Sequence, residues 1–434
     1  MKQLTRLFIP ICLETLFYML SGMVDTLMLS AVGDYAVGAV GTANSYIGIF
    51  IIMFSIISSG MVSVMTQNIG AGRPGVAYQA RQLGLLFNAV AGVLMAVFLF
   101  SGAGAILRMV GIADALYEPA LIYLKIVGGG CILNAVIPIF SSYLRAFGYT
   151  KQPLYATIVG NIANFVMNAV FLFVLHKGVA GVAAATVISK ILNLCIVLYF
   201  SHKLISAKNS TERIANKTVL GQIVKVGLPS ACETALYNVA MMLVIRFLNQ
   251  MDAEGLNVTA RSYTATISNF SYCVGAALAQ ANAIMTGWHI GAGELEECDR
   301  GTKRAAFVGV CVAVCMETVI VLGSGFIMPL FTDNPEMTAL VRKLLAIDIV
   351  LEIGRVTNLV FGQALKTSGD AVFPAVIAAV FMFVFAVGGT WLFGISMGLM
   401  AVGAYIGLAS DECVRAVGMV WRWKTGKWRT KKLV

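Results

Sequence analysis

Apolar stretches of membrane-spanning length follow one another along the whole chain of 434 residues. A helix needs about 20 mostly apolar residues to cross a bilayer. We find twelve candidates, near residues 7–29, 40–65, 83–106, 120–144, 153–175, 179–200, 223–248, 260–286, 305–330, 340–365, 374–398 and 402–421. Lipid offers no partners to unpaired backbone groups, and the alternating pattern of an outer-membrane barrel is missing from the sequence. The sequence therefore predicts an all-α membrane protein with twelve transmembrane helices.

Charged residues are scarce and unevenly placed. They make up 12% of the chain, against about 25% in soluble domains. If successive helices cross the membrane in opposite directions, both termini lie on one side. That side then holds 22 of the 31 Lys and Arg residues, and the opposite side holds seven. The positive-inside rule then predicts cytoplasmic termini, in a multi-pass protein of the inner (cytoplasmic) membrane. The net charge of +10 is explained by this topology, and we predict no nucleic-acid partner.

Cysteine and histidine patterns give no sign of a metal or redox centre. The nine cysteines form no Cys-x-x-Cys pair, and the three histidines lie far apart in the sequence. Metal sites need such ligands at short, regular spacings. We predict no metal site and no enzymatic activity; an integral-membrane enzyme is the alternative from another class.

The sequence repeats itself across its two halves. The pattern Pro-x-x-x-Glu-Thr-x-x-Tyr begins at Pro10 and again 219 residues later at Pro229. A Gly-Ala-Gly loop begins at Gly70 and again 221 residues later at Gly291. Landmarks in the same order at nearly constant offset indicate two copies of a six-helix unit. Parallel repeats of this kind are typical of transporters that rock one half against the other.

The repeat predicts four regions. Helices 1 to 6 form an N-lobe over residues 1–201, and helices 7 to 12 form a C-lobe over residues 219–421. A polar cytoplasmic linker over residues 202–218 joins the lobes, and a basic cytoplasmic tail covers residues 422–434. We interpret the tail, with its tryptophans, as an anchor at the membrane interface and expect the protein to be a monomer.

The first helix carries four polar residues on one face. Glu14, Tyr18, Ser21 and Asp25 are spaced i, i+4, i+7 and i+11, which places them within about 40° of each other around a helix. An ionisable residue inside a membrane needs a partner or a function. Asp25 is the leading candidate for a carboxylate that exchanges a cation for substrate, with a purely structural carboxylate as the alternative.

Other polar residues in the spans admit structural explanations. Asn164 and Asn168 lie one turn apart in the fifth helix, where they serve either a site or interhelical hydrogen bonding. Glu352 and Arg355 are spaced to pair with each other. Glu14 and its repeat Glu233 are placed to fix proline-containing helices to their neighbours. Remaining charges within or near the spans, with no role assigned, are Lys190, Glu317, Asp411 and Glu412.

These features together resemble the MATE (multidrug and toxic compound extrusion) family. The resemblance covers nearly the whole chain and is carried by Val24-Asp25-Thr26, the Gly-Ala-Gly loops, the Asn164/Asn168 pair, and the paired loops Leu144–Gly148 and Leu365–Gly369. It implies two six-helix lobes in a V and antiport of organic cations or other amphipathic small molecules against H⁺ or Na⁺. The transported ion is then the only cofactor.

The resemblance also implies a cation site in the N-lobe. Asp25, Asn164 and Thr186 match the family's ligands by position, and Asn168 stands where the family often has a second aspartate. In the C-lobe, Glu233 lies about a turn before the position of the family's helix-7 glutamate, and Arg355 replaces an aspartate of helix 10. The resemblance thus predicts coupling through the N-lobe alone.

Further polar candidates for substrate or lobe contacts are Glu14, Tyr18, Glu233, Tyr237, Glu352 and Arg355. A lipid-linked-precursor flippase of the same superfamily is the nearest alternative function. Such a flippase is expected to have a more basic cavity and additional helices.

Overall fold

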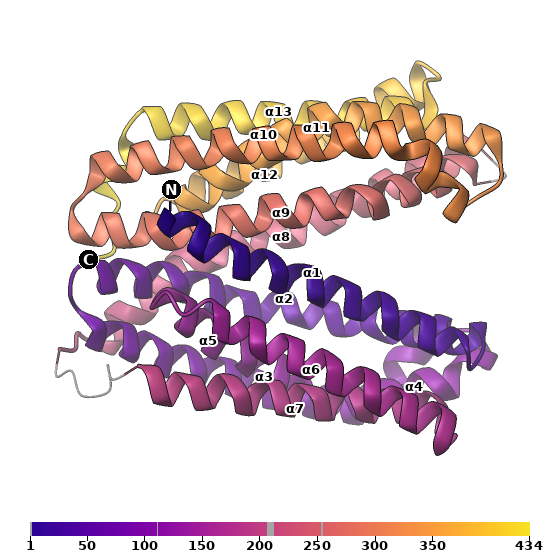
Figure 1. Cartoon of the computed structure of the whole chain (residues 1–434), viewed down its shortest axis with the longest axis horizontal. Helices are drawn as coiled ribbons and strands as arrows, with labels where there is room; N and C mark the ends of the chain where they lie inside the picture. Colours follow the sequence, from indigo (N-terminus) through magenta and orange to yellow (C-terminus); the bar gives the residue numbers. More distant parts are fainter. Residues whose placement is uncertain (1, 111, 206–211, 253–254) are drawn as a thin grey trace. The chain divides into compact units, whose positions relative to one another are not determined.

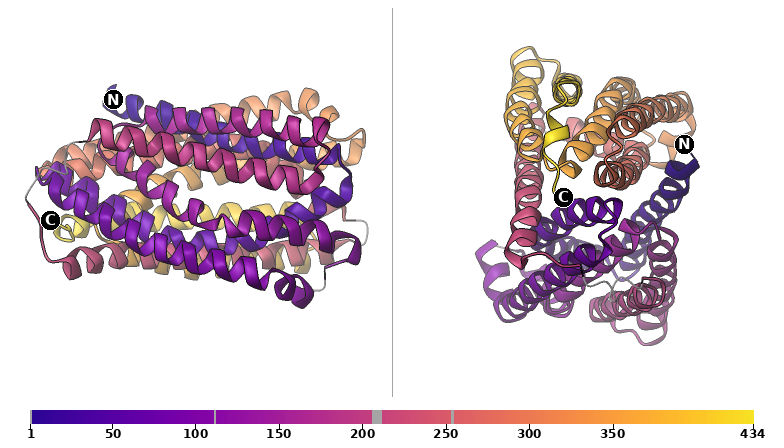
Figure 2. Two further views of the ribbon diagram at one scale, coloured as in Figure 1. Left: turned by 90° about the horizontal axis from the view of Figure 1, so that it is seen from below. Right: turned by 90° about the vertical axis from the view of Figure 1, so that its left-hand side faces the viewer.

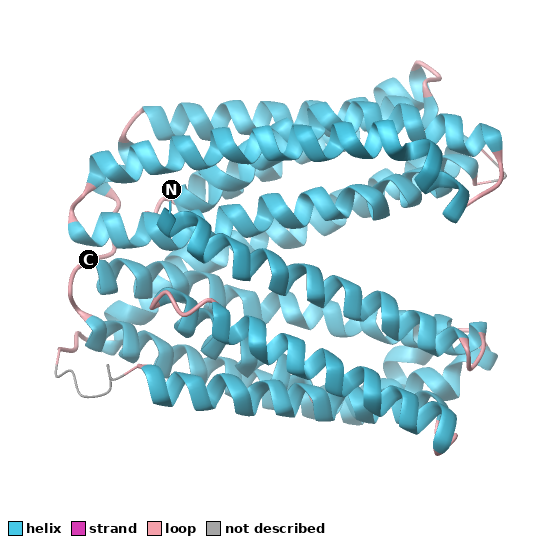
Figure 3. Ribbon diagram, in the orientation of Figure 1, coloured by secondary structure: helices cyan, strands magenta, loops and turns pink. Residues whose placement is uncertain are grey.

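The computed structural model describes residues 2–110, 112–205, 212–252 and 255–434. Within those residues the chain is helical and contains no β-strand (Figure 3). It divides into an N-terminal unit, Ile9–Gly227, and a C-terminal unit, Leu228–Val434 together with Met1–Phe8. Inside each unit the helices run roughly side by side (Figures 1 and 2).

The first six membrane segments belong to the N-terminal unit. They are α1 (Lys2–Ser30), α2 (Asp34–Gly70), α3 (Pro74–Val110), the pair α4 (Asp114–Gly129) and α5 (Cys131–Ala146), α6 (Lys151–Ala169) with the π-helical turn η1 (Val170–Val174), and α7 (Gly178–Leu204).

The next six segments build the C-terminal unit. They are α8 (Asn216–Met251), α9 (Leu256–Ala292), α10 (Leu295–Ile327) followed by η3 (Met328–Leu330), α11 (Pro335–Thr367), α12 (Val372–Phe381) continued by the π-helical η4 (Met382–Val387) and η5 (Thr390–Ser396), and α13 (Met400–Lys424). A short 3₁₀-helix, η6 (Lys427–Thr430), follows. The division between the units falls inside α8.

The twelve-helix fold class is confirmed, but the segments differ in polarity. Among the described residues, eight single helices and the α4–α5 pair are long and apolar enough to cross a membrane. The other three segments, α9, α11 and α13, are too polar or too highly charged to meet the same criterion. They lie in the C-terminal unit, where α11 packs against both α9 and α13. These three helices carry buried polar residues such as Asn282, Asp348 and Asp411.

The two units use the same packing pattern. In the N-terminal unit α3 packs on α2 and on the α4–α5 pair, and in the C-terminal unit α10 packs on α9 and α11. The last two segments of each half also pack together, α6 on α7 and α12 with its π-helical continuation on α13. The repeat in the sequence is thus a repeat in the helix packing.

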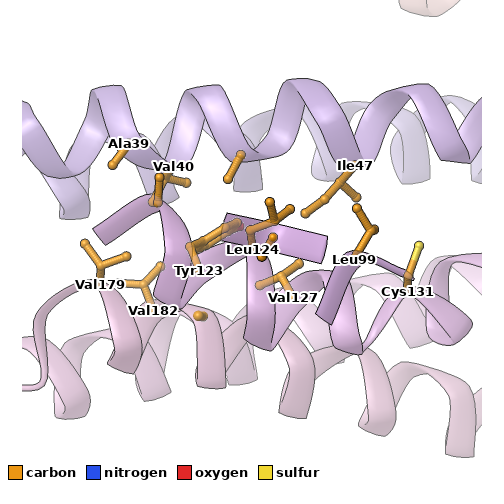
Figure 4. Close-up of a cluster of buried hydrophobic side chains, with 14 of the residues drawn as sticks. Ala39, Val40, Ile47, Leu99, Tyr123, Leu124, Val127, Cys131, Val179 and Val182 are labelled. Carbon is orange, nitrogen blue, oxygen red and sulfur yellow. The ribbon is translucent and has the colours of Figure 1, made fainter. Parts of the chain in front are cut away.

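Small and aliphatic side chains fill the core of the N-terminal unit. Ala39 and Ile47 of α2 meet Leu99 of α3, Leu124 of α4 and Val182 of α7 (Figure 4). Alanines at such positions let helices approach closely, which is the main source of packing contacts between membrane helices.

One segment is broken in the N-terminal unit and continuous in the C-terminal unit. The α4–α5 pair bends by 41° at the run Gly128-Gly129-Gly130, whereas α11 has no break. Glycine lowers the cost of leaving helical geometry, and a Cβ on Gly130 would approach Val187 Cγ2 to 3.2 Å. The bend therefore depends on local glycines that the second copy lacks.

The structure describes the whole predicted tail and part of the predicted linker. Residues 206–211 of the linker lie outside the described residues, but the following residues bind α3, where Gln79 Nε2 donates to Ile214 O at 2.7 Å and to Asn216 Oδ1 at 2.5 Å. In the tail, Trp423 and Trp428 stack at 4.2 Å and are buried. Both tryptophans of the tail are therefore buried, whereas Trp421, which precedes the tail, is exposed.

Close contact between α12's π-helical continuation and α13 depends on facing glycines. A Cβ on Gly407 of α13 would lie 2.9 Å from the backbone carbon of Gly389 and 3.0 Å from Phe385 O. We expect Gly407→Ala to lower stability by about 1–3 kcal/mol because backbone atoms must move apart. Gly418→Ala on the same helix is the control, since its Cβ would meet only Ile377 Cγ2 at 3.6 Å. Equal thermal unfolding temperatures for both variants would contradict this packing.

Candidate functional site

The structure brings three of the four predicted cation-site residues together. Asn168 Nδ2 donates to Asp25 Oδ1 at 2.8 Å and to Asn164 Oδ1 at 3.1 Å. Asn164 and Asn168 are buried, and Asp25 is half-buried. Asn168 Oδ1 has no hydrogen-bond partner, so the cluster presents one carboxylate and an unused amide oxygen.

Thr186 does not join this cluster directly. Its hydroxyl donates to Val182 O, one turn back on α7, at 2.9 Å. It also interacts with the hydroxyl of Tyr123, a buried residue that lies close enough to Asp25 for an electrostatic interaction and that interacts with Asn44 as well. Tyr123 and Asn44 are polar groups of this region that the sequence patterns did not reveal, because neither belongs to a repeated or charged motif.

A lysine lies beside the carboxylate. The Lys190 ammonium group on α7 interacts electrostatically with Asp25 and donates to Asn134 Oδ1 on α5 at 2.8 Å. Its presence inside a span was the available signal, because an intramembrane lysine needs a partner; the sequence did not show which partner. The N-terminal site therefore pairs a negative group with a positive group of the protein itself.

Both repeated glutamates form ion pairs at equivalent places. Arg145 Nη2 of α5 lies 2.6 Å from Glu14 Oε1, and Lys366 Nζ of α11 lies 2.7 Å from Glu233 Oε2. Each pair joins the first helix of a unit to its fourth membrane segment. In each half, this ion pair is a contact of the kind that the structural interpretation of Glu14 and Glu233 requires.

Two further contacts hold α1 on α6. Asn161 Nδ2 donates to Phe17 O at 2.9 Å, and Thr157 Oγ1 lies 3.5 Å from Glu14 Oε1. Together with the Asp25–Asn168 hydrogen bond, these contacts are spaced along α1 and α6 in the same order on both helices. α1 is therefore attached in this unit by polar contacts along α6 in addition to buried apolar side chains such as Leu29.

We expect Glu14→Gln to lower stability by about 1–3 kcal/mol, because it leaves the largely buried Arg145 without its carboxylate. The pair is only 18% and 13% exposed at its arginine and glutamate side chains. The exchange Glu14→Arg with Arg145→Glu should recover most of the loss in thermal unfolding. A double variant no more stable than Glu14→Gln would show that the pair does not act through its charges.

The two predicted tyrosines have different surroundings. Tyr18 is 74% exposed, on the rim of the polar face of α1. Tyr237 lines a cavity of about 470 Å³ inside the C-terminal unit. The helical repeat therefore places equivalent side chains in unequal environments.

That cavity is lined by charges of both signs in equal number. The acidic lining residues are Glu233, Asp348, Asp411 and Glu412, and the basic ones are Arg261, Arg355, Lys366 and Arg415. Apolar side chains such as Met241 and Leu351 complete the wall. A cavity of this composition suits an amphipathic ligand that carries no large net positive or negative charge.

A network of ion pairs occupies one wall of the cavity. Arg355 pairs with Glu352 and lies 3.7 Å from Glu412 Oε1. Arg415 Nη2 contacts Asp411 Oδ2 at 2.7 Å and Glu412 Oε1 at 2.8 Å. The predicted Glu352–Arg355 pair is present, and it belongs to a larger cluster shared by α11 and α13.

Two repeated units of membrane helices, with buried ionisable groups and a cavity between helices, are typical of membrane transporters. A family model described as MatE matches residues 10–170 and 229–392, and the chain belongs to this family. It is accordingly a transporter and not an enzyme.

Relatives extend over nearly the full chain. An uncharacterized transporter of Bacillus subtilis (strain 168), YisQ, is 32% identical over 428 residues, covering 97% of this chain and 94% of that protein. The probable multidrug resistance protein NorM of Thermotoga maritima is 20% identical, covering 100% and 94%.

Solved structures share the fold. A crystal structure of MATE in the bent conformation has a TM-score of 0.86 at 20% identity, with 99% of this chain and 96% of that chain covered. A MOP superfamily transporter from Pyrococcus furiosus, described as having a binding pocket of reversed polarity, has a TM-score of 0.83 at 20% identity, with coverage of 99% and 96%.

Proposed function

We propose that this protein exports cationic or amphipathic small molecules by antiport against protons. The Asp25–Asn168–Asn164 cluster supports this proposal most directly, because it offers one half-buried carboxylate held in place by a single amide donor. A carboxylate in such a place exchanges charge states as ions or protons arrive and leave. The resemblance of these residues to the family's cation site points the same way.

Lys190 favours the proton over sodium as the coupling ion. Its ammonium group already balances the charge of Asp25, so a bound Na⁺ would be repelled by a fixed cation in a low-dielectric site. Protonation of Asp25 needs no further ligands and would release Lys190 from the carboxylate.

The substrate class rests on the relatives and on the cavity. A relative named as a probable multidrug resistance protein aligns with the entire chain, and the cavity of the C-terminal unit mixes apolar wall with balanced charge. We further propose that the two six-helix lobes alternate access, that the protein is a monomer in the inner membrane, and that both termini are cytoplasmic. The flippase alternative is not favoured, because equal numbers of acidic and basic residues line the cavity.

Transport of ethidium by purified protein in proteoliposomes tests the proposal. An imposed pH difference supplies about 1.36 kcal/mol per pH unit, and a sodium gradient is imposed in a separate preparation. We expect ethidium movement under the proton gradient and none under the sodium gradient alone. Movement driven only by sodium would contradict the proton assignment, and movement with neither ion would contradict antiport of this substrate class.

A further inference from the structure

A second carboxyl group lies in the membrane interior without a stated role. Glu317 of α10 is 0% exposed, and neither of its carboxyl oxygens has a hydrogen-bond partner at normal geometry. The proposed N-terminal site makes no use of it, since Glu317 belongs to the C-terminal unit.

The groups that face Glu317 do not neutralise a negative charge. From α11, Asp348, Glu352 and Arg355 act on it electrostatically, and from α9 the hydroxyl of Ser271 approaches it. The only cation among them, Arg355, is shared by Glu352 and Glu412. The third neighbour of α10, the short η3 turn of sequence Met-Pro-Leu, contributes no titratable group.

A carboxylate in this position is therefore buried, unpaired and next to two further acids. Burial of an unpaired charge is far more costly than burial of the neutral acid. A bound metal cation is the other way to balance the charge, but the described acids do not converge on a shared metal position. A proton is the ligand that the geometry fits.

Asp348 offers a route between Glu317 and water. It lines the cavity of the C-terminal unit, it is only 2% exposed, and its Oδ2 atom has no hydrogen-bond partner. We propose that Glu317 is a proton-binding site and that Asp348 relays its proton. In the relay, a hydronium ion in the cavity gives a proton to the Asp348 carboxylate and becomes water. Asp348 then passes its proton to the Glu317 carboxylate and becomes ionised again.

This site would give the C-terminal half a part in coupling that the sequence did not predict. That use of the site rests on the proposed proton antiport, whereas proton binding itself does not. With Asp25 in one unit and Glu317 in the other, each six-helix half would hold one exchangeable proton.

Infrared spectroscopy of the full-length protein in lipid tests the site without substrate. We expect wild-type protein at neutral pH to show the C=O stretch of a protonated carboxyl that shifts in D₂O and is missing in Glu317→Gln. Glu336→Gln is the control, because Glu336 is an exposed acid at the start of α11. In Asp348→Asn the band should remain, and its response to a pH jump should slow at least tenfold.

Identical carboxyl bands in wild-type protein and folded Glu317→Gln would overturn the proton site, and an unchanged pH-jump response in Asp348→Asn would overturn the relay. If Glu317→Gln does not fold, wild-type protein is treated with dicyclohexylcarbodiimide, which adds to protonated carboxyls in apolar surroundings. Peptide mass spectrometry should find the adduct on Glu317, and an adduct on Glu352 with none on Glu317 would count against the proposal. Asp25→Asn should keep the Glu317 band, so failure of antiport and failure of this site are told apart.

Discussion

Asp25→Asn is expected to reduce proton-driven ethidium transport to the level of protein-free liposomes. Asparagine has the size of aspartate. In the wild-type protein, Asn168 Nδ2 donates to Asp25 Oδ1 at 2.8 Å, and the amide oxygen of the substituted residue can accept the same hydrogen bond. It cannot take up or release a proton at the working pH. The substitution therefore removes the charge change on which coupling depends and leaves the contact between α1 and α6.

The matched control for this experiment is Asp114→Asn. Asp114 is an exposed aspartate in the first turn of α4 in the same unit, so its substitution removes the same charge away from the cluster. We expect this control to transport as wild type does, and both variants to unfold at similar temperatures. Gradient-driven transport that persists in folded Asp25→Asn would remove Asp25 from the coupling mechanism.

Arg415→Met is expected to destabilise the C-terminal unit by about 3–5 kcal/mol, the usual cost of removing one member of a buried ion cluster. Arg415 is only 4% exposed, and its guanidinium contacts Asp411 through two hydrogen bonds of 3.0 and 2.7 Å as well as Glu412. Methionine fills part of the volume but leaves two carboxylates without their cation. A fall of the unfolding temperature on the order of 10 °C should follow.

Thiol reactivity provides the measurement, because buried cysteines such as Cys298 become accessible to a fluorescent maleimide when the helices separate. The control is Arg300→Met, whose exposed pair with Glu297 is worth about 0–1 kcal/mol. Adding Asp411→Asn and Glu412→Gln to Arg415→Met should restore much of the stability. An Arg415→Met protein as stable as Arg300→Met would show that the cluster is not a buried ionic network.

Several features of the fold were predictable because they depend on local composition. Apolar runs of membrane-spanning length identify helices irrespective of their neighbours. Inside the bilayer, such a segment can pair all its backbone N–H and C=O groups within itself only as a helix. The repeated pattern beginning at Pro10 and Pro229 correctly indicated two equivalent units. The spacing of Glu352 and Arg355 predicted an ion pair within one helix, where sequence distance sets spatial distance.

Contacts between segments far apart in the chain were harder to predict from the sequence. The sequence showed that Glu14 and Glu233 repeat, but Arg145 and Lys366 became their partners only when the fourth membrane segment of each unit packed beside the first. Lys190 was visible as an unexplained charge, and the approach of α7 to α1 made it the neighbour of Asp25.

The sequence by itself determined which segments are helices, that they form two copies of one design, and that Asp25, Asn164 and Asn168 are polar groups inside the membrane. Helical periodicity and hydrophobicity are properties of neighbouring residues within a few turns, so the sequence alone is enough to recognise them. Only the tertiary structure decided which charges neutralise each other, which line the cavity and which, like Glu317, remain buried without a counterion. Electrostatic energy depends on distances between helices far apart in the chain and on burial from water, and neither quantity exists until the helices have packed.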